Sequence, residues 1–196
     1  MVKILFATGN KGKVNEIREI LKGVDAEVLT MKEAGFDIEV DENGSTYEEN
    51  AILKAKAVME ASGCLTLADD SGLEVDYRNK EPGINSARYM GHETSYDIKN
   101  QSFIDKLQGV PDEQRTARFV CAIAAVLPGG RELTTRATIE GRIDYEEKGE
   151  HGFGYDPIFY VPELGCTTAE IPESEKNLIS HRGKALTQMK EKLQEL

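Results

Sequence analysis

The sequence predicts an α/β fold with a mixed β-sheet flanked by helices, and two observations lead to this prediction. Residues 2–7 form a short apolar run, followed by a loop and then by apolar residues at helical spacing, which is the strand–loop–helix order of α/β proteins. Apolar residues alternate along 117–127 and again along 133–139, on either side of Pro128-Gly129-Gly130, which predicts a long antiparallel hairpin. The two patterns together imply a mixed sheet.

Chain length and charge limit the classes of partner. The 196 residues correspond to one large domain or two small lobes. Lys and Arg number 24, Asp and Glu number 35, and the net charge is −11. A negative charge spread over the surface repels nucleic-acid backbones and anionic lipids. The longest apolar run, residues 119–127, is far shorter than the roughly 20 residues of a membrane-spanning helix. We therefore expect neither nucleic acid nor a membrane as partner.

The N-terminus and the cysteines indicate the compartment. The first apolar run contains Lys3 and is too short for the apolar core of a secretion signal. Cys64, Cys121 and Cys166 are odd in number and widely spaced, so they predict reduced thiols rather than a disulfide framework or a zinc site. These features predict a cytoplasmic protein.

Spacing and turn signals predict the remaining elements. Thr46 and Glu49 form a capping-box pattern, which predicts a helix that begins there. Residues 65–68 predict a buried strand that leads into the acidic segment 69–72, and residues 73–77 alternate as a half-buried strand. Further helices are predicted over residues 14–21, over 94–107 and from Ser180 onward, with an irregular loop over 149–157.

The loop TGNKGK at residues 8–13 lies between the first strand and the first helix. Its glycines expose backbone N–H groups, the helix N-terminus adds partial positive charge, and two lysines add more, a pattern typical of an anion site. The two glycines are too close together for a Walker A loop, and Val14 stands where that motif has a metal-binding hydroxyl, which excludes P-loop ATPase or GTPase activity. The same residues also fit a glycine turn whose lysines face solvent.

Acidic residues gather in two segments. Asp69 and Asp70 are adjacent at the end of a buried strand, so their carboxylates point to opposite sides and one of them can enter a cleft. Asp41 and Glu42 lie on a loop before the helix that begins at Thr46, and could bring a second oxygen ligand toward Asp70. Mg²⁺ takes one or two carboxylates together with substrate phosphates. Asp-Ser-Gly is also an ordinary turn sequence, so a purely structural turn stays open.

Two later segments carry candidate base-binding residues. In the glycine-flanked loop at 152–157, Phe153 and Tyr155 offer flat faces for a stacked purine, unless both pack into the core. His181 and Arg182 lie in the first turn of the closing helix, where cations oppose the helix dipole. An anionic or carbonyl ligand explains that placement, and a solvated basic turn is the alternative.

Six motifs, in their order along the chain, resemble those of the Ham1-type inosine/xanthosine triphosphate pyrophosphatases. They are TGNKGK at 8–13, TYEENA at 46–51, LADDSGL at 67–73, PGINSARY at 82–89, FGYDP at 153–157 and SHRGKAL at 180–186. The resemblance extends over essentially the whole chain and implies one domain over residues 1–196. It also implies the fold of these ITPases: an elongated mixed sheet flanked by helices, with two lobes and the active-site cleft between them.

The resemblance further implies a reaction and a site. The expected activity is hydrolysis of non-standard purine triphosphates such as ITP, dITP and XTP to the monophosphate and pyrophosphate, with Mg²⁺ as cofactor, by a homodimer. By position, Asp70 would be the catalytic base and, with Asp41, a metal ligand, while Glu42 stands beside Asp41. The residues implied in substrate binding are Thr8, Gly9, Asn10, Lys11, Gly12, Lys13, Ser71, Phe153, Gly154, Tyr155, Asp156, Lys176, His181 and Arg182.

The expected chemistry is attack of a water, oriented by Asp70, on the α-phosphorus, with Lys11 and Lys13 neutralising the pyrophosphate leaving group. A 6-oxopurine presents an acceptor where adenine presents a donor, so Arg182 would favour it over adenine. Two other classes stay open: a nucleotide sensor without catalysis, and a Maf-like pyrophosphatase or a general phosphatase with another preference. Release of pyrophosphate from ITP in the presence of Mg²⁺ separates them.

Overall fold

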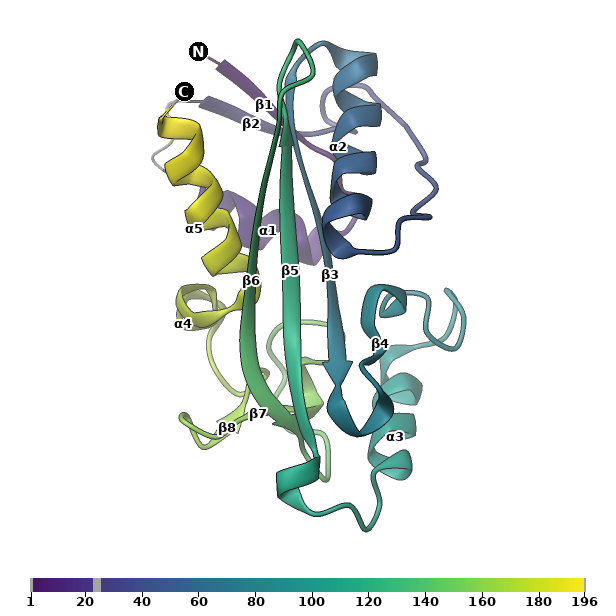
Figure 1. Cartoon of the computed structure of the whole chain (residues 1–196). Helices are drawn as coiled ribbons and strands as arrows, with labels where there is room; N and C mark the ends of the chain where they lie inside the picture. Colours follow the sequence, from purple (N-terminus) through teal and green to yellow (C-terminus); the bar gives the residue numbers. More distant parts are fainter. Residues whose placement is uncertain (1, 23–25, 196) are drawn as a thin grey trace. The chain divides into compact units, whose positions relative to one another are not determined.

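The structure, a computed structural model, describes residues 2–22 and 26–195, with only the backbone of Val2 and Lys11. The chain divides into two compact units. Unit 1 comprises Met1–Asp70, Cys121–Ala137 and His181–Leu196, and unit 2 comprises Ser71–Val120 and Thr138–Ser180. Both units receive residues from the strands β3 (Leu65–Val75), β5 (Thr116–Val126) and β6 (Glu132–Ile143) (Figure 1).

Unit 1 is a sheet with helices on both faces. Its strands are β1 (Val2–Phe6), β2 (Ala26–Thr30) and the adjoining parts of β3, β5 and β6, in the order β2-β1-β3-β5-β6. Strand β1 is parallel to both β2 and β3. The helices are α1 (Lys11–Ile20), α2 (Tyr47–Ser62) and α5 (His181–Gln194). In Figure 1, α1 and α5 lie on one side of these strands and α2 lies on the other.

The apolar pattern of β1 explains the two helical layers. Phe6 packs in a core with Ile17 of α1 and Leu186 of α5, whereas its neighbour Leu5 packs in a second core with Ala51 of α2. Because successive side chains of a strand point to opposite faces, the consecutive apolar residues 4–6 of β1 need cover on both faces. The mixed α/β sheet flanked by helices is therefore confirmed.

Strand β3 is continuous from Leu65 to Val75, so the prediction that Asp69 and Asp70 lie at the end of a strand is wrong, and the alternative of a purely structural turn does not hold either. Leu67 packs on the α1 and α5 face and Ala68 on the α2 face. The alternation continues through Asp69 and Asp70, of which only 1% and 6% are exposed. A turn keeps such carboxylates in solvent, whereas here partners on both faces of the sheet compensate for their burial and the backbone stays extended.

Helix α2 begins where the capping-box pattern predicts it. Thr46 Oγ1 accepts a hydrogen bond from the N–H of Glu49 at 3.1 Å, and the Glu49 carboxylate accepts one from the N–H of Ser45 at 2.6 Å. The helix ends at Gly63, whose φ of 69° is the left-handed conformation that glycine adopts most readily. The acidic loop that precedes α2 is thus fixed to its first turn.

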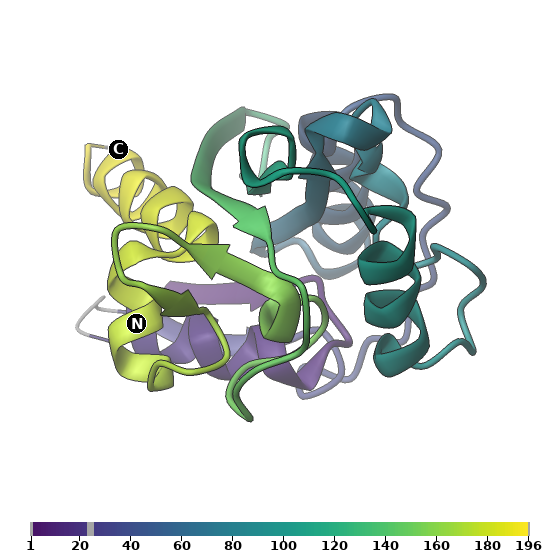
Figure 2. The same cartoon turned by 90° about the horizontal axis from the view of Figure 1, so that it is seen from below.

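Unit 2 holds three short antiparallel strands beside its parts of β3, β5 and β6. Strand β4 (Glu81–Pro82) pairs with β3, and the order continues β3-β5-β6-β7-β8, with β7 (Phe159–Val161) antiparallel to β6 and β8 (Cys166–Thr167) antiparallel to β7. The two short strands β7 and β8 lie side by side in the light green part of Figure 2. The helices are α3 (Tyr96–Lys106) and α4 (Glu173–Ile179). Phe103 of α3 and Phe159 of β7 belong to the core of this unit.

The other predicted elements are present with small shifts of their ends. The β5–β6 hairpin turns where Leu127 N–H donates to the carbonyl of Arg131 at 2.9 Å. Helix α5 begins at His181, one residue after the predicted start, and Ser180 is the C-cap of α4. The sequence did not predict the short elements β2, β4, β7, β8 and α4. In the described parts of the chain, no helix has both the length and the apolar character needed to cross a membrane.

Candidate active site

The loop at residues 8–13 in unit 1 is closed by the side chain of Asn10, the N-cap of α1. Asn10 Oδ1 accepts hydrogen bonds from the N–H groups of Gly12 at 2.9 Å and Lys13 at 3.3 Å, and Thr8 Oγ1 accepts one from the Asn10 N–H at 3.2 Å. These are helix N-terminal N–H groups of the kind that bind anions elsewhere, and here the cap satisfies them. Gly9 and Asn10 are exposed, and the Lys11 side chain lies outside the described residues.

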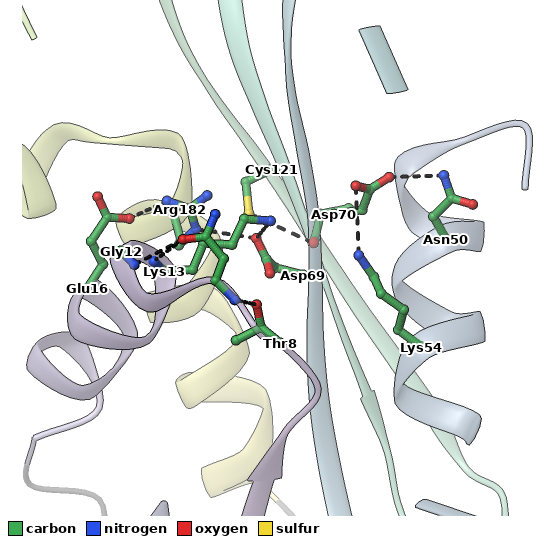
Figure 3. Close-up of polar contacts among 12 residues, drawn as sticks. Thr8, Gly12, Lys13, Glu16, Asn50, Lys54, Asp69, Asp70, Cys121 and Arg182 are labelled. Carbon is green, nitrogen blue, oxygen red and sulfur yellow. Dashed lines mark hydrogen bonds and ion pairs between the residues drawn. The ribbon is translucent and has the colours of Figure 1, made fainter. Parts of the chain in front are cut away.

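Behind this loop, Asp69 holds two cations on the α1 and α5 face of β3 (Figure 3). Its Oδ2 atom lies 2.8 Å from Lys13 Nζ and accepts a hydrogen bond from Arg182 Nε at 3.4 Å. Arg182 also donates to the carboxylate of Glu16, one turn beyond Lys13 in α1. Asp69, Glu16 and Arg182 are buried, and Lys13 is largely covered. Two cations and two carboxylates therefore form a cluster without net charge.

The pKa values of this cluster reflect mutual stabilisation of charge. Burial alone would raise the pKa of Asp69, but the charges of Lys13 and Arg182 outweigh it and hold the pKa below its ordinary value of 3.8. Burial alone would lower the pKa of Arg182, but Asp69 and Glu16 raise it. Both groups stay charged. The carboxylates of Asp69 and Glu16 therefore balance the charge of Arg182, although it lies at a helix N-terminus.

Asp70 lies on the opposite face of β3, where α2 supplies its partners (Figure 3). Asn50 Nδ2 donates a hydrogen bond to Asp70 Oδ2 at 3.0 Å, and Lys54 Nζ lies 3.9 Å from Asp70 Oδ1. Burial raises the pKa of Asp70 above its ordinary value, Lys54 and Asn50 oppose the rise, and the Glu42 charge adds to it. The site therefore contains one buried carboxylate with a strengthened affinity for a proton.

The acidic loop reaches this carboxylate through Glu42. Glu42 Oε2 is 3.0 Å from the same Lys54 ammonium that lies near Asp70, and Glu42 is half-buried. Asp41, the residue that the resemblance implies as a metal ligand, is exposed. The geometry joins Glu42 to Asp70 through one cation, and the role of Asp41 stays a prediction.

In unit 2, Asp156 holds the loop at 152–157 together. Its Oδ2 accepts hydrogen bonds from the Phe153 N–H at 2.9 Å and from Lys176 Nζ at 2.7 Å, and its Oδ1 accepts one from Thr168 Oγ1 at 2.7 Å. Asp156, Lys176 and Thr168 are buried. This carboxylate is therefore occupied by the loop, by α4 and by the segment after β8.

The two aromatic residues of this loop differ in environment. Tyr155 is buried in the core of unit 2, and its hydroxyl donates to the Ser86 carbonyl at 2.8 Å, so the core alternative holds for this ring. Phe153 is half-buried, with Lys176 Nζ 5.3 Å from its ring centroid. Between them, the Gly154 carbonyl accepts a hydrogen bond from Asn100 Nδ2 at 3.3 Å. Phe153 is thus less buried than Tyr155, and its stacking on a base stays a prediction.

The structure also places the remaining predicted site residues and brings two further residues to the site. Ser71 is half-buried next to Asp70 in β3, and His181 is buried at the start of α5. Sequence reasoning missed Asn50 and Lys54, which are four residues apart and thus share one face of α2. A polar pair beside the apolar residues of a helix was the available signal.

Comparison with known proteins identifies the family. The model of the Ham1 family matches residues 4–192. A dITP/XTP pyrophosphatase of Desulforamulus reducens is 49% identical over 195 residues, covering 100% of this chain and 97% of that protein. The structure of a HAM1 protein from Coxiella burnetii superposes with a TM-score of 0.91 at 38% identity, with 100% of both chains covered. That of the Staphylococcus aureus Ham1 protein gives 0.88 at 41% identity, with 98% of both covered. The resemblance of the six motifs is confirmed, and the chain belongs to the Ham1 family.

Proposed function

We propose that this protein hydrolyses non-standard purine nucleoside triphosphates, such as dITP, XTP and ITP, to the monophosphate and pyrophosphate, which keeps them out of DNA and RNA. Its similarity to a dITP/XTP pyrophosphatase over the full chain supports the substrate class. The structural observation that carries the proposal is the buried Asp70 carboxylate, which shares the Lys54 ammonium with Glu42. A buried acid beside a cation and a second acid suits proton transfer and the binding of phosphate-bound metal.

Asp70 is the proposed general base. A raised pKa makes its carboxylate a stronger proton acceptor once it is ionised. In the proposed step, a water oxygen bonds to the α-phosphorus and its proton passes to Asp70. The P–O bond between the α-phosphorus and the bridging oxygen breaks, and pyrophosphate leaves with the bonding electrons. Lys13 and Lys11 would neutralise the charge on the leaving group, within the loop at 8–13.

We propose Mg²⁺ as the cofactor. The available oxygen ligands fit this ion. The carboxylates of Asp70 and Glu42 lie 3.9 and 3.0 Å from the same Lys54 Nζ atom, so both are close to one position of positive charge. The described residues contain no group of three His, Cys, Asp or Glu side chains that could hold a metal, and Mg²⁺ completes its coordination with waters and substrate phosphates. Asp70 would hold it with Glu42 or Asp41. When bound, the ion supplies charge neutralisation at the phosphate oxygens.

The nucleoside would be bound by the residues that the family resemblance implies. Phe153 is the proposed stacking face, Gly154 permits close approach of the backbone, and Asp156 with Lys176 holds the loop. Arg182 is the proposed donor to the 6-oxo group, since its guanidinium, held in place by Asp69 and Glu16, carries N–H donors and no acceptor. Tyr155, Ser71 and His181 complete the proposed set.

Further proposals concern the assembled protein. We propose that residues 1–196 act as a single pyrophosphatase domain and that two copies form a homodimer, with a small-molecule nucleotide as substrate. We also propose a cytoplasmic location, which the free thiols of Cys64, Cys121 and Cys166 suit because that compartment is reducing. Light scattering on the purified protein measures the number of copies in the particle.

A product assay tests the proposed reaction. ITP, XTP, dITP, GTP, ATP and a modified pyrimidine triphosphate are each incubated with the protein and Mg²⁺, and pyrophosphate and orthophosphate are measured separately. Pyrophosphate from ITP, XTP and dITP, with little from ATP, supports the proposal. Orthophosphate release indicates a general phosphatase, preference for the pyrimidine indicates a Maf-like enzyme, and binding without turnover indicates a sensor.

A further inference from the structure

One buried amide, that of Asn50, joins the candidate base to the acidic loop. Asn50 is fully buried in the first turns of α2. Its Nδ2 donates to Asp70 Oδ2 at 3.0 Å, and its Oδ1 accepts from the N–H of Gly44 at 2.8 Å. The side chain therefore connects strand β3 with the loop that carries Glu42, while its own backbone N–H stays in the helix by donating to Thr46.

The chemistry of the two partners fixes the orientation of this amide. A backbone N–H can only donate and a carboxylate can only accept, so the Asn50 oxygen must face Gly44 and the nitrogen must face Asp70. An aspartate at position 50 would keep the acceptor for Gly44 but would lose the donor for Asp70. An alanine would lose both. Position 50 thus requires a side chain with an acceptor that faces Gly44 and a donor that faces Asp70.

The loop backbone lies close against the amide. A Cβ atom at Gly44 would be 2.8 Å from Asn50 Oδ1 and 2.8 Å from the Cβ of Glu49, closer than real Cβ contacts, so this position has no room for a side chain. The Glu49 carboxylate also accepts a hydrogen bond from the N–H of Ser45, the residue that follows Gly44. Two adjacent residues of the loop are therefore tied to the first turns of α2.

Asn50 and Lys54 lie one turn apart on the same face of α2, and each contacts both strand β3 and the acidic loop. Lys54 follows Asn50 by four residues, and its ammonium lies between Glu42 at 3.0 Å and Asp70 at 3.9 Å. The amide fixes which way the Asp70 carboxylate faces, and the ammonium compensates the charge of the two acids. Without the amide, the Asp70 side chain loses its hydrogen bond to α2.

From this arrangement we propose that Asn50 is a positioning residue, which orients the Asp70 carboxylate and holds the Glu42 loop against it. It acts through Asp70 and does not touch the nucleotide. The inference rests on the proposed function of Asp70 as base and metal ligand. Partners that orient the groups around a metal affect activity or metal affinity by about 10- to 100-fold when they are replaced.

The first test uses Asn50→Asp with Asn43→Asp as its matched control. Asn43 lies on the same acidic loop but is exposed, so this variant adds the same charge without touching the amide. We expect Asn50→Asp to lower kcat for ITP by about 10- to 100-fold while KM changes by less than about threefold, and Asn43→Asp to behave like the unmodified protein. Equal kcat values in the two variants, or a loss confined to KM, overturn the proposal.

The second test needs neither substrate nor metal. In Asn50→Asp, two carboxylates face each other across the former hydrogen bond, and adding Asp70→Asn restores a donor and an acceptor in exchanged positions. Asp70→Asn should therefore raise the urea midpoint of Asn50→Asp by more than it changes that of the unmodified protein. An equal change in both backgrounds overturns the proposed contact. If the unmodified protein releases no pyrophosphate, the proposed function fails, and this measurement alone decides whether Asn50 orients Asp70.

Discussion

Asp69 and Asp70 are neighbours in β3 whose carboxylates serve different helices. Asp69 Oδ2 lies 2.8 Å from Lys13 of α1, and Asp70 Oδ2 accepts a hydrogen bond of 3.0 Å from Asn50 of α2. The alternation of a strand separates the two groups, and their surroundings shift the pKa of Asp69 downward and that of Asp70 upward. The opposite shifts suit the two roles that we propose, Asp69 as a fixed counter-ion and Asp70 as a proton acceptor.

Asp70→Asn tests the second role. The amide keeps the size of the side chain but cannot accept the proton of the attacking water, so kcat for ITP should fall by about 10²- to 10⁴-fold. Nucleotide affinity, measured by calorimetry, should change little, since the loop at 8–13 and Arg182 are untouched. A variant that retains more than about a tenth of the original kcat would show that Asp70 is not the base.

Asp69→Asn tests the first role. Removing this carboxylate takes away the counter-charge that Lys13 and Arg182 share. We expect a loss of about 3 kcal/mol in the free energy of unfolding at pH 7, the low end of the range for breaking a buried ion pair. Urea denaturation followed by circular dichroism measures it. A loss close to zero would contradict the role of Asp69 as a counter-ion.

The stabilisation that Asp69 provides, measured with the same variant, should depend on pH. The pKa of Asp69 in the folded protein lies below its ordinary value of 3.8. Its contribution to stability is therefore complete above that pH and is lost as the pH falls from 3.8 toward the folded-state pKa. The difference in unfolding free energy between the unmodified protein and Asp69→Asn should shrink below pH 3.8. A difference that grows on acidification has the wrong sign.

Cysteine reactivity reports on the core of unit 1. Burial raises the pKa of the Cys121 thiol to about 12 and also raises the pKa of the Cys166 thiol, but Cys64 and Cys166 are only half-buried, so both are partly exposed to reagent. Because the thiolate is the reactive form, iodoacetamide at pH 8 should label Cys64 and Cys166 in the folded protein and Cys121 only after unfolding. Mass spectrometry of the labelled peptides separates the three sites. Labelling of native Cys121 as fast as Cys64 would contradict the structure.

Gly152→Ala tests the hydrogen-bonded loop of unit 2, with Gly130→Ala as its control. Both glycines have positive φ, 74° and 87°, so both variants bear the backbone strain of about 1–2 kcal/mol. A Cβ at residue 152 would also clash with the Asp156 carboxylate, whereas one at residue 130 has nothing within 4 Å. Gly152→Ala should be less stable than Gly130→Ala by at least about 1 kcal/mol and should raise KM for ITP. Equal stabilities would show that Asp156 does not hold this loop.

The sequence predicts those elements whose local signals agree with their packing. Thr46 and Glu49 locate the start of α2, and the alternation along 117–127 locates β5. The sequence leaves a turn open at 69–72 because its turn preference is local, while the partners that keep the segment extended come from α1, α2 and α5. Helix α4 is only seven residues long and has too few turns to show a period.

The residues of the candidate site are likewise predictable where a local motif carries them, and not where they are brought together by packing. Motif spacing points to Asp70, Lys13 and Arg182, because loops and strand ends carry recognisable patterns. It cannot reveal that Arg182 pairs with Glu16, 166 residues away, or that Asn50 meets Asp70 across 20 residues. Such contacts depend on which helix covers which face of the sheet, and that is decided by the packing of the whole unit.

Hydrolysis of ITP in water enriched in ¹⁸O, with the isotope located by mass spectrometry, identifies the phosphorus atom that the water attacks. If water activated by Asp70 attacks the α-phosphorus, the label appears in the monophosphate and the pyrophosphate is unlabelled, and Asp70→Asn suppresses both products together. Label in pyrophosphate or orthophosphate would contradict attack at the α-phosphorus and with it the proposed reaction.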